Sequence, residues 1–238
     1  MAKQYEQLHT AQEILNLRSG ELALGRNSNE TVALRTNIEW CLEFLCNPHP
    51  DLGRVGPVCP FVELSIKKGL LWLTLAHTAS GDIEHVRRTV LRYKEIFLAS
   101  DPIQGSDAIF KCILIVLPDV KSADAPDFVD GLQESLKAEF VECDLMLGEF
   151  HVKNNTPRLW NSRFRPLRAP VPMLVIRHMV STDLPFLVNG QRYIRSYLNR
   201  FSREGRTRLR AYIQKYSEGL KQESYQVLLA ELRRATGN

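Results

Sequence analysis

The segment FKCILIVLPD, residues 110–119, constrains the fold more strongly than any other part of the sequence. Its central residues 112–117 are all apolar, which is typical of a strand that is buried on both faces. Amphipathic helices are predicted on either side of it, over residues 82–100 and 126–140. The first of them has apolar side chains at helical spacing, namely Ile83, Val86, Val90, Tyr93 and Phe97. A buried strand between two helices requires crossover connections, which place the chain in a layered α/β or α+β class.

Three more apolar runs are predicted to be strands, and they are LLWLTLAHT (70–78), DLMLGEFHV (144–152) and PMLVIRHMV (172–180). Together with the first segment they indicate a central sheet of about four strands with crossover helices. Two helices are expected before residue 46, and the chain becomes helical again from about residue 193. We therefore predict an α/β domain over residues 1–190 that includes the N-terminal helical pair. A C-terminal helical extension over residues 191–238 is expected to pack on it.

The composition favours a folded protein of the cytoplasm. Charged residues make up 24% of the sequence and the formal net charge is only +4, so overall charge gives no reason to expect nucleic-acid binding. The five cysteines form no CxxC pair, which favours reduced thiols over a disulfide framework or a structural zinc site. The N-terminus lacks the apolar region of a signal peptide, and no stretch approaches the roughly 20 apolar residues of a membrane span. We expect a cytoplasmic protein without a membrane span.

The motif GPVCPFVELSIKKG, residues 56–69, predicts a short helix that begins just after Cys59. Pro60 suits the first helical position because its missing N–H would be unpaired there, and Gly69 suits the C-terminal cap. Cys59 would then occupy or adjoin the N-cap, where the helix dipole and free N–H groups favour a thiolate. A thiolate is a nucleophile, a redox centre or a metal ligand. The alternative is that Cys59 is a small buried side chain, as most free cysteines are.

In the loop before the last predicted strand, all the charged residues are basic. Between Glu149 and Asp183 there is no acidic residue, whereas Lys153, Arg158, Arg163, Arg165, Arg168 and Arg177 all fall there. Guanidinium groups bind carboxylates and phosphates bidentately, so the loop indicates an anionic cofactor, ligand or partner. Trp160 and Phe164 are placed to wall a flat ligand. The alternatives are that the arginines pair with acidic residues elsewhere in the fold and that the aromatic residues anchor the loop to the core.

His151 ends a predicted strand and enters this basic loop, so it is the histidine best placed for metal ligation or proton transfer. A hydrogen-bonded structural histidine is the alternative.

The C-terminal helices carry many arginines, which would attract nucleic acid. However, Tyr193, Tyr197 and Phe201 recur every four residues, as in a packing stripe. This spacing favours a solvated or dimerising helix face and makes a homodimer plausible.

The sequence resembles a bacterial domain family of unassigned function that is recognised by CPF, GEFH and RFRPLRAPVPM, over roughly residues 55–190. More distantly, it is similar to the YqcI/YcgG-type haem-dependent oxygenases, some of which hydroxylate a guanidine or amine nitrogen. The corresponding segments here are Cys59-Pro60-Phe61, Asn155-Thr156-Pro157 and Phe164-Arg165-Pro166. In that family a histidine closely follows the Asn-Thr-Pro turn, whereas this chain has Arg158 and Leu159 there.

The resemblance implies haem as the cofactor, with either His151 or the Cys59 thiolate as the axial ligand of the iron. The remaining residues that it implies for haem binding are Arg158, Arg163, Arg165, Arg168, Asn155, Phe61, Trp160 and Phe164, the arginines holding the propionates.

Three functions are therefore considered. The first is a haem-binding, oxygenase-like enzyme that acts on a small amine or amino-acid-like metabolite. The second is a non-catalytic binding or accessory module for an anionic small molecule or a protein partner. The third is a thiol enzyme with Cys59 as nucleophile and His151 as base. Phosphate-loop, dinucleotide-binding GxGxxG, HExxH and GxSxG motifs are missing from the sequence, which argues against conventional nucleotide hydrolysis and zinc proteolysis.

Overall fold

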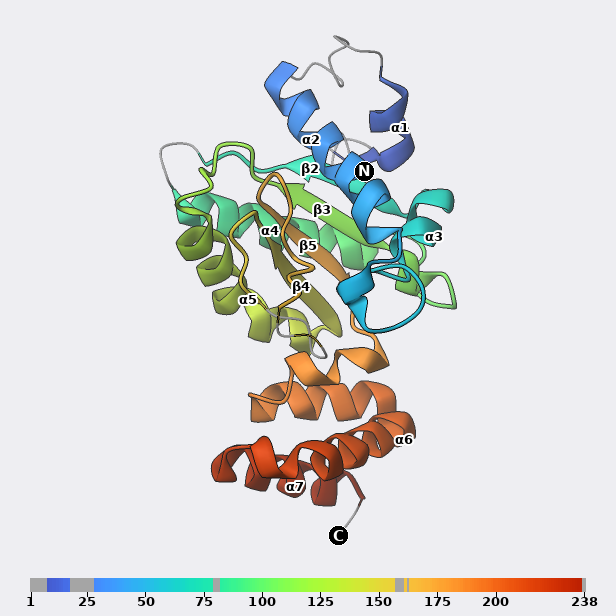
Figure 1. Ribbon diagram of the computed structural model, residues 1–238, viewed down its shortest axis with the longest axis vertical. Helices are drawn as coiled ribbons and strands as arrows, with labels where there is room; N and C mark the ends of the chain where they lie inside the picture. The colour runs from blue at the N-terminus through green and yellow to red at the C-terminus, as the bar shows by residue number, and fades with distance from the viewer. Residues whose placement is uncertain (1–7, 18–27, 79–81, 157–160, 162, 237–238) are drawn as a thin grey trace. The chain divides into compact units, whose positions relative to one another are not determined.

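The computed structural model describes residues 8–17, 28–78, 82–156, 161 and 163–236 (Figure 1). The contacts within the chain divide it into two compact units. Unit 1 consists of Met1–Ser135 and Leu147–Arg177, and unit 2 consists of Leu136–Met146 and His178–Asn238. Each unit is thus assembled from two separate stretches of the chain.

A mixed sheet forms the centre of the α/β fold, and in the described part of the chain it has five strands. They are β1 (His9–Thr10), β2 (Leu71–Leu75), β3 (Cys112–Val116), β4 (Leu145–Phe150) and β5 (Met173–His178), in the spatial order β1-β2-β3-β5-β4. β2 and β3 run parallel, with Leu71 opposite Cys112, whereas β3 and β5 run antiparallel, with Val116 opposite Met173. The predicted α/β class and its four strands are confirmed, and the short β1 adds a fifth strand antiparallel to β2.

Helices connect β1 to β2, β2 to β3 and β3 to β4, and they lie at both ends of the chain, as predicted (Figure 1). Unit 1 contains α1 (Ala11–Asn16), α2 (Ser28–Trp40), η2 (Cys41–Leu45), η3 (Pro50–Leu52), α3 (Val62–Lys67), α4 (Ile83–Ala99), η5 (Ala108–Phe110) and η6 (Pro126–Asp130), where η marks a short 3-10 or π helix. α5 (Gly131–Glu142) begins in unit 1 and ends in unit 2, which also contains η7 (Ser181–Phe186), α6 (Gln191–Tyr216), η8 (Ser217–Gly219) and α7 (Gln222–Thr236). None of the helices described for this chain has the length and apolar character needed to cross a lipid bilayer.

Both faces of the β2–β3 pair are covered, as the continuous apolar run predicted. Leu114 and Val116 belong to the same buried core as Leu34 of α2. Side chains of successive strand residues point to opposite faces of a sheet. On the opposite face, the hydroxyl groups of Thr74 in β2 and Tyr93 in α4 share a buried hydrogen bond of 2.7 Å. α2 and α4 therefore enclose the two central parallel strands between them.

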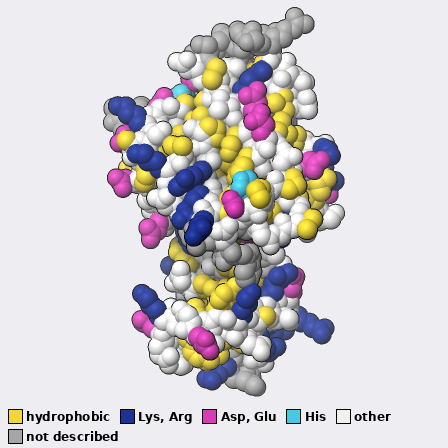
Figure 2. All heavy atoms as spheres, viewed as in Figure 1, with side chains coloured by type: hydrophobic (Ala, Val, Ile, Leu, Met, Phe, Trp, Pro, Cys, Tyr) yellow, Lys and Arg dark blue, Asp and Glu magenta, His cyan; other side chains and the backbone are white. Residues whose placement is uncertain are grey.

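Unit 2 has its own core, in which Ile194, Tyr197 and Leu198 of α6 are buried together with Leu228 of α7. Four of the seven arginines of α6 are paired with acids. Arg192, Arg195, Arg200 and Arg208 form ion pairs with Glu142, Glu231, Asp144 and Glu204, respectively. On the face seen in Figure 2, Lys and Arg side chains in this part of the chain are interspersed with Asp and Glu. Mixed charge of this kind favours a solvated surface over a phosphate-binding one.

Candidate functional site

The loop that connects β4 to β5 contains most of the residues that the sequence singled out. His151 is its first residue, and the backbone N–H of His151 donates to the carbonyl of Leu167 at 3.3 Å. Leu167 lies shortly before Met173, the first residue of β5. Met173 pairs with Val116, the last residue of β3. The loop therefore lies near the end of the sheet that contains the carboxyl end of β3. Ligand-binding residues are commonly found at the carboxyl ends of parallel strands.

His151 itself is completely buried. Its Nε2 lies 2.9 Å from Oδ1 of Asp130, the last residue of η6. Its Nδ1 is also buried and has no hydrogen-bond partner in the described part of the chain. A neutral imidazole has one N–H donor and one lone-pair acceptor. Donation from Nε2 to the Asp130 carboxylate therefore leaves the lone pair on Nδ1, where none of the described residues binds it.

Arg168 is exposed, but its guanidinium stabilises the turn that follows His151. Its Nε donates to the carbonyl of Asn154 at 3.0 Å, and one terminal nitrogen donates to Oδ1 of Asn155 at 3.0 Å. Asn154 is buried, and its own Oδ1 accepts from the backbone N–H of Thr156 at 2.9 Å. The predicted ligand residues Arg168 and Asn155 are thus brought together, but they bind each other.

The other residues predicted from the basic loop are divided between its core side and its surface. Phe164 is buried and stacks on His49 with ring centres 4.6 Å apart, next to Phe44 at 6.0 Å. Arg165 is half-buried and donates to the carbonyl of Phe164 at 3.3 Å, whereas Arg163 is exposed. Arg158 and Trp160 lie outside the described residues.

The loop also contacts the segment that precedes the CPF motif. Nδ2 of Asn161 donates to the carbonyl of Asp51 at 3.0 Å, and its Oδ1 accepts from the backbone N–H of Arg163 at 2.9 Å. Trp40 and Phe44 are stacked at 5.6 Å, and Trp40 meets Phe150, the last residue of β4, edge-on at 6.1 Å. The basic loop is therefore anchored to η2 and the η3 region by an aromatic cluster, which we define as Trp40, Phe44, His49, Phe150 and Phe164.

The interpretation of Cys59 as an N-cap residue is wrong. α3 begins at Val62, and its N-cap residue is Phe61, so Pro60 precedes the helix instead of occupying its first position. Only the predicted C-terminal cap is confirmed, since Gly69 has a φ of +67° and its N–H donates to the carbonyl of Ile66 at 3.0 Å. The backbone N–H of Cys59 is used by the carbonyl of Leu45 at 2.9 Å. The helix dipole therefore gives no reason to expect a thiolate at Cys59.

Cys59 is half-buried against the core that contains Cys41. Burial raises the pKa of the Cys41 thiol well above its usual value, that of Cys46 to about 11 and that of Cys112 to about 12. These three thiols are protonated at neutral pH and serve as small core or near-core side chains. Among the described residues, the hydrogen bonds of His151 run to Asp130, Leu167 and Asn154. His151 is therefore not hydrogen-bonded to Cys59 as the general base of a thiol enzyme would be.

Phe61, the last residue of the CPF motif, packs on Phe110 with ring centres 6.4 Å apart. Phe110 precedes the first residue of β3, whereas the His151 loop lies near the end of that strand. The residues of the CPF motif and His151 are thus associated with different ends of β3.

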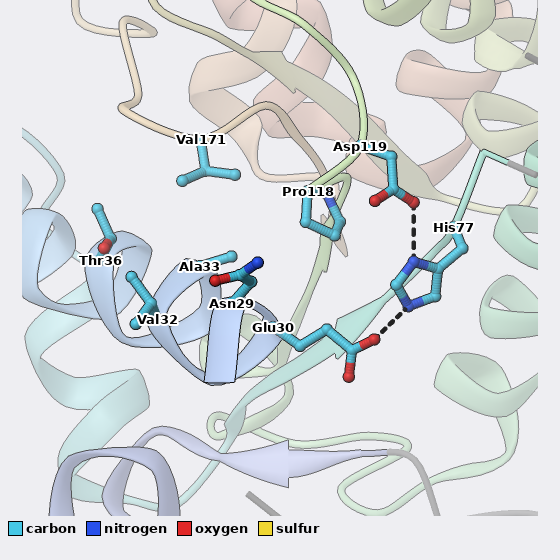
Figure 3. A pocket seen from close by; sticks show the side chains of 9 residues that line it. All are labelled: Asn29, Glu30, Val32, Ala33, Thr36, His77, Pro118, Asp119 and Val171. Atoms are coloured by element: carbon cyan, nitrogen blue, oxygen red, sulfur yellow. Dashed lines mark hydrogen bonds and ion pairs between the residues drawn. The ribbon is translucent and has the colours of Figure 1, made fainter. Parts of the chain in front are cut away.

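A second cluster was missed by the sequence analysis. His77 lies two residues after β2, and Asp119 lies three residues after β3, so both follow the carboxyl ends of adjacent parallel strands. Nδ1 of His77 is 2.8 Å from Oδ2 of Asp119, and its Nε2 is 3.1 Å from Oε1 of Glu30 in the first turn of α2 (Figure 3). The available signal was a polar residue two or three positions after each of two buried strands, a position typical of ligand-binding residues in parallel sheets. Among the described residues, no group of three or more His, Cys, Asp or Glu is arranged to hold a metal ion.

Comparison with known families gives one match, to the family described as domain of unknown function DUF6875, over residues 34–212. Neither the curated proteins nor the solved structures contain a significant match. The matched region includes α3, every strand except β1, the His151 loop and most of α6.

Proposed function

This chain belongs to the DUF6875 family, and we propose that it is a haem-binding, oxygenase-like enzyme that acts on a small amine or amino-acid-like metabolite. The observation that carries the proposal is the pair of His151 and Asp130. Histidines that bind metals nearly always donate their second ring N–H to a carboxylate, a carbonyl or water. The 2.9 Å contact between Nε2 and Asp130 has this form, and the lone pair of Nδ1 is left for a ligand.

The buried Nδ1 of His151 supports a ligand at this position in a second way. A buried polar atom without a partner costs about 1–3 kcal/mol of folding free energy, which a bond to a ligand would offset. His151 therefore fits the role of an axial ligand better than Cys59, which does not lie at the N-terminus of α3. Haem bound through a histidine supplies the chemistry of oxygen binding and activation.

Residues of this chain would orient and enclose the haem. Asp130 would keep the proton on Nε2 of His151 and so fix the orientation of the ring. Arg163 is exposed on the same loop, and its guanidinium can pair with a carboxylate of an anionic cofactor. Since the side chain of His151, the first residue of the loop between β4 and β5, has no exposed surface, the groups that cover Nδ1 would have to move before a cofactor could reach it. We therefore expect binding of the cofactor to be slow and to change the protease sensitivity of this loop.

An absorption spectrum of the protein expressed with a haem precursor tests the proposal. We expect a Soret band, either directly or after hemin is added to the purified protein. His151→Ala should abolish or shift the band, whereas Cys59→Ala and His85→Ala, a change at an exposed histidine of α4, should leave it in place. Asp130→Asn should retain the fold and weaken hemin binding about tenfold, because partners of a metal-bound histidine typically contribute that much.

Two results would overturn the haem proposal. One is the lack of a Soret band after hemin addition to protein whose circular dichroism shows that it is folded. The other is a Soret band that is identical in the wild type, His151→Ala and Asp130→Asn.

A second candidate function is a non-catalytic module that binds an anionic small molecule or a protein partner through the basic loop. The exposed Arg163 in a segment without acidic residues favours it. Binding of a dicarboxylate that Arg163→Gln weakens, in protein that takes up no hemin, would support this function over the first.

A further inference from the structure

α6 departs from helical geometry at one residue. Along Gln191–Tyr216 the backbone angles of Ser202 are not helical, with a φ of +43° and a ψ of −113°. Glycine adopts a conformation with positive φ readily, whereas residues with a β-carbon rarely do. The side chain of Ser202 is exposed, so burial of that side chain does not offset the strain. Conformational strain is therefore concentrated at one exposed residue in the middle of a long helix.

The helix bends sharply at Ser202. We call the part before it α6N (residues 191–201) and the part after it α6C (residues 203–216). A β-carbon built on Gly205 in α6C would lie 3.3 Å from Cε1 of Tyr197 in α6N. These two residues are eight positions apart, which corresponds to about 12 Å along a straight helix. The start of α6C therefore lies against α6N instead of continuing along its axis.

The sequence of α6 does not require this bend. Position 202 holds neither proline nor glycine, and no proline occurs anywhere in α6. The apolar side chains keep helical spacing through the bend, and they are Ile194, Tyr197, Leu198, Phe201, Leu209, Tyr212, Ile213 and Tyr216. With about 3.6 residues per turn, all of them would lie on one face of a straight helix. The sequence of α6 is thus also suited to a single straight helix about 39 Å long.

The core of unit 2 is built from contacts across the bend. Leu209 and Ile213 of α6C and Leu228 of α7 are buried in one core with side chains of α6N. Arg195 of α6N also pairs with Glu231 of α7 at 2.8 Å. In each of these contacts one partner lies before the bend and the other lies after it. A second copy of the chain carries the same groups, so the part of the chain that follows the bend can make these contacts with either copy.

We propose that Ser202 is the hinge of a domain-swapped dimer, in which the partner is a second copy of this chain. In the dimer Ser202 is helical, α6 is straight, and residues 203–236 of each copy pack on α6N of the other. The exchange removes the strain at Ser202 and keeps the core contacts. A short hinge under strain favours exchange of this kind, and the exchange closes symmetrically with two chains. The proposal does not rest on haem binding.

Two substitutions at the hinge test the proposal in opposite directions. Glycine relieves the strain of the bend and is a poor helix former, so Ser202→Gly should favour the monomer. Alanine keeps the strain and is the best helix former, so Ser202→Ala should favour the dimer. Size-exclusion chromatography with light scattering measures the dimer fraction of the full-length proteins over a range of concentrations. In the wild type we expect both species, with a dimer fraction between those of the two variants.

The size of the effect follows from helix propensity. Alanine and glycine differ about fivefold in their effect on helix formation, and each dimer contains two hinges. The dissociation constants of the Ser202→Ala and Ser202→Gly dimers should therefore differ at least about 30-fold. Asn199 gives the matched control, because it is an exposed residue of α6N that is helical in both forms. Asn199→Ala and Asn199→Gly should have equal dimer fractions.

The lifetime of the dimer distinguishes exchange from simple docking of two surfaces. Return to the monomer requires the core of unit 2 to open, so the isolated Ser202→Ala dimer should persist for hours after dilution in the cold. Unfolding in urea and refolding at low concentration should convert it to the monomer. The proposal is overturned if Ser202→Ala forms no more dimer than Ser202→Gly, or if the two Asn199 variants differ as much as the two hinge variants. Dissociation of the dimer within minutes of dilution would also overturn it, because docked copies separate without unfolding.

Discussion

Lys111 shows how a single charged residue can be accommodated in the core. Its side chain is completely buried, and Nζ donates to the carbonyls of Phe97 at 2.7 Å and of Ser100 at 2.6 Å. These carbonyls belong to the end of α4, where the last C=O groups have no partner within the helix and the dipole is negative. Lys111 therefore caps α4 from the start of β3. Burial nevertheless disfavours the charged amine and lowers its pKa to about 8, against the opposing effect of Asp101.

This lowered pKa predicts a pH dependence of stability. Below about pH 8 the amine is protonated in both the folded and the unfolded chain, so it does not make the free energy of unfolding depend on pH there. Between about pH 8 and about pH 10.4 the unfolded chain binds more protons than the folded one. The free energy of unfolding should therefore rise with pH through this window. Lys111→Met, which keeps the length of the side chain without its charge, should remove the rise.

Urea unfolding of the wild type and Lys111→Met at several pH values measures this difference. Other lysines and tyrosines titrate in the same range, but they contribute equally to both proteins and cancel. Two parallel curves across the window would show that Lys111 keeps its ordinary affinity for protons in the folded chain.

Individual site residues were only partly accessible from the sequence. His151 was identified because it ends a strand and enters the basic loop, but its bond to Asp130 joins residues 21 positions apart, which no local pattern reveals. His77 was missed for the same reason, since its partners Asp119 and Glu30 are 42 and 47 positions away. The N-cap interpretation of Cys59 failed because α3 begins at Val62 instead of Pro60, so Phe61, not Cys59, directly precedes the helix. Contacts between side chains that are far apart in the sequence thus cannot be predicted from local sequence patterns.

The secondary structure elements were more predictable, because their cause is local. The apolar stripe of α4 and the continuous apolar run of β3 each follow from spacing within one segment. The order of the strands was not predictable, since β5 inserts between β3 and β4 and pairs Cys112 with Arg177. Two-residue β1 is too short to produce an alternating pattern and was missed as well.

At the level of elements, α6 and α7 are joined by a buried carboxylate. Glu231 of α7 is only 2% exposed and accepts hydrogen bonds from Arg195 at 2.8 Å, Gln191 at 2.9 Å and Arg234 at 2.8 Å. The hydrogen bond from Arg195, together with those from Arg234 and Gln191, lowers the pKa of Glu231 to about 2 despite its burial. The ionised form is thus strongly favoured in the folded unit.

Glu231→Gln should destabilise unit 2. A group with a lowered pKa contributes stability above its unfolded pKa and loses it as the pH falls to its folded pKa. The contribution of Glu231 should therefore be complete at neutral pH, on the order of 3 kcal/mol, and should disappear between about pH 4.5 and about pH 2. Near-UV circular dichroism of tyrosine measures it, because Tyr193, Tyr197 and Tyr212 belong to this unit.

Glu204→Gln is the matched control for this prediction. Glu204 also accepts from an arginine, Arg208 at 2.8 Å, but both side chains are exposed, so water screens the pair. An equal loss of stability in Glu204→Gln and Glu231→Gln would mean that burial does not strengthen the pairing of Glu231.

At the level of the whole molecule, the family match and the two units divide the chain differently. The match covers residues 34–212 and therefore includes parts of both units. Unit 2 contains the stretch Leu136–Met146, which is separated in sequence from its helices α6 and α7. An evolutionary unit that includes segments of both compact units is expected to fold as one piece. The domain boundary predicted at residue 190 stays a prediction, and shortening the chain tests it.

A chain that ends at residue 190 should expose apolar surface. Leu184, Leu187 and Val188 are buried in the core of unit 2 together with residues of α6, including Ile194. Removal of α6 would uncover them, so we expect the fragment 1–190 to bind the apolar dye ANS more strongly than the full chain and to elute early in size-exclusion chromatography. Polar substitutions of Leu184 and Leu187 in the same fragment should reduce both effects, because the exposed side chains cause them. A fragment that stays monomeric, binds no more dye than the full chain and unfolds cooperatively would instead establish residues 1–190 as an independent domain.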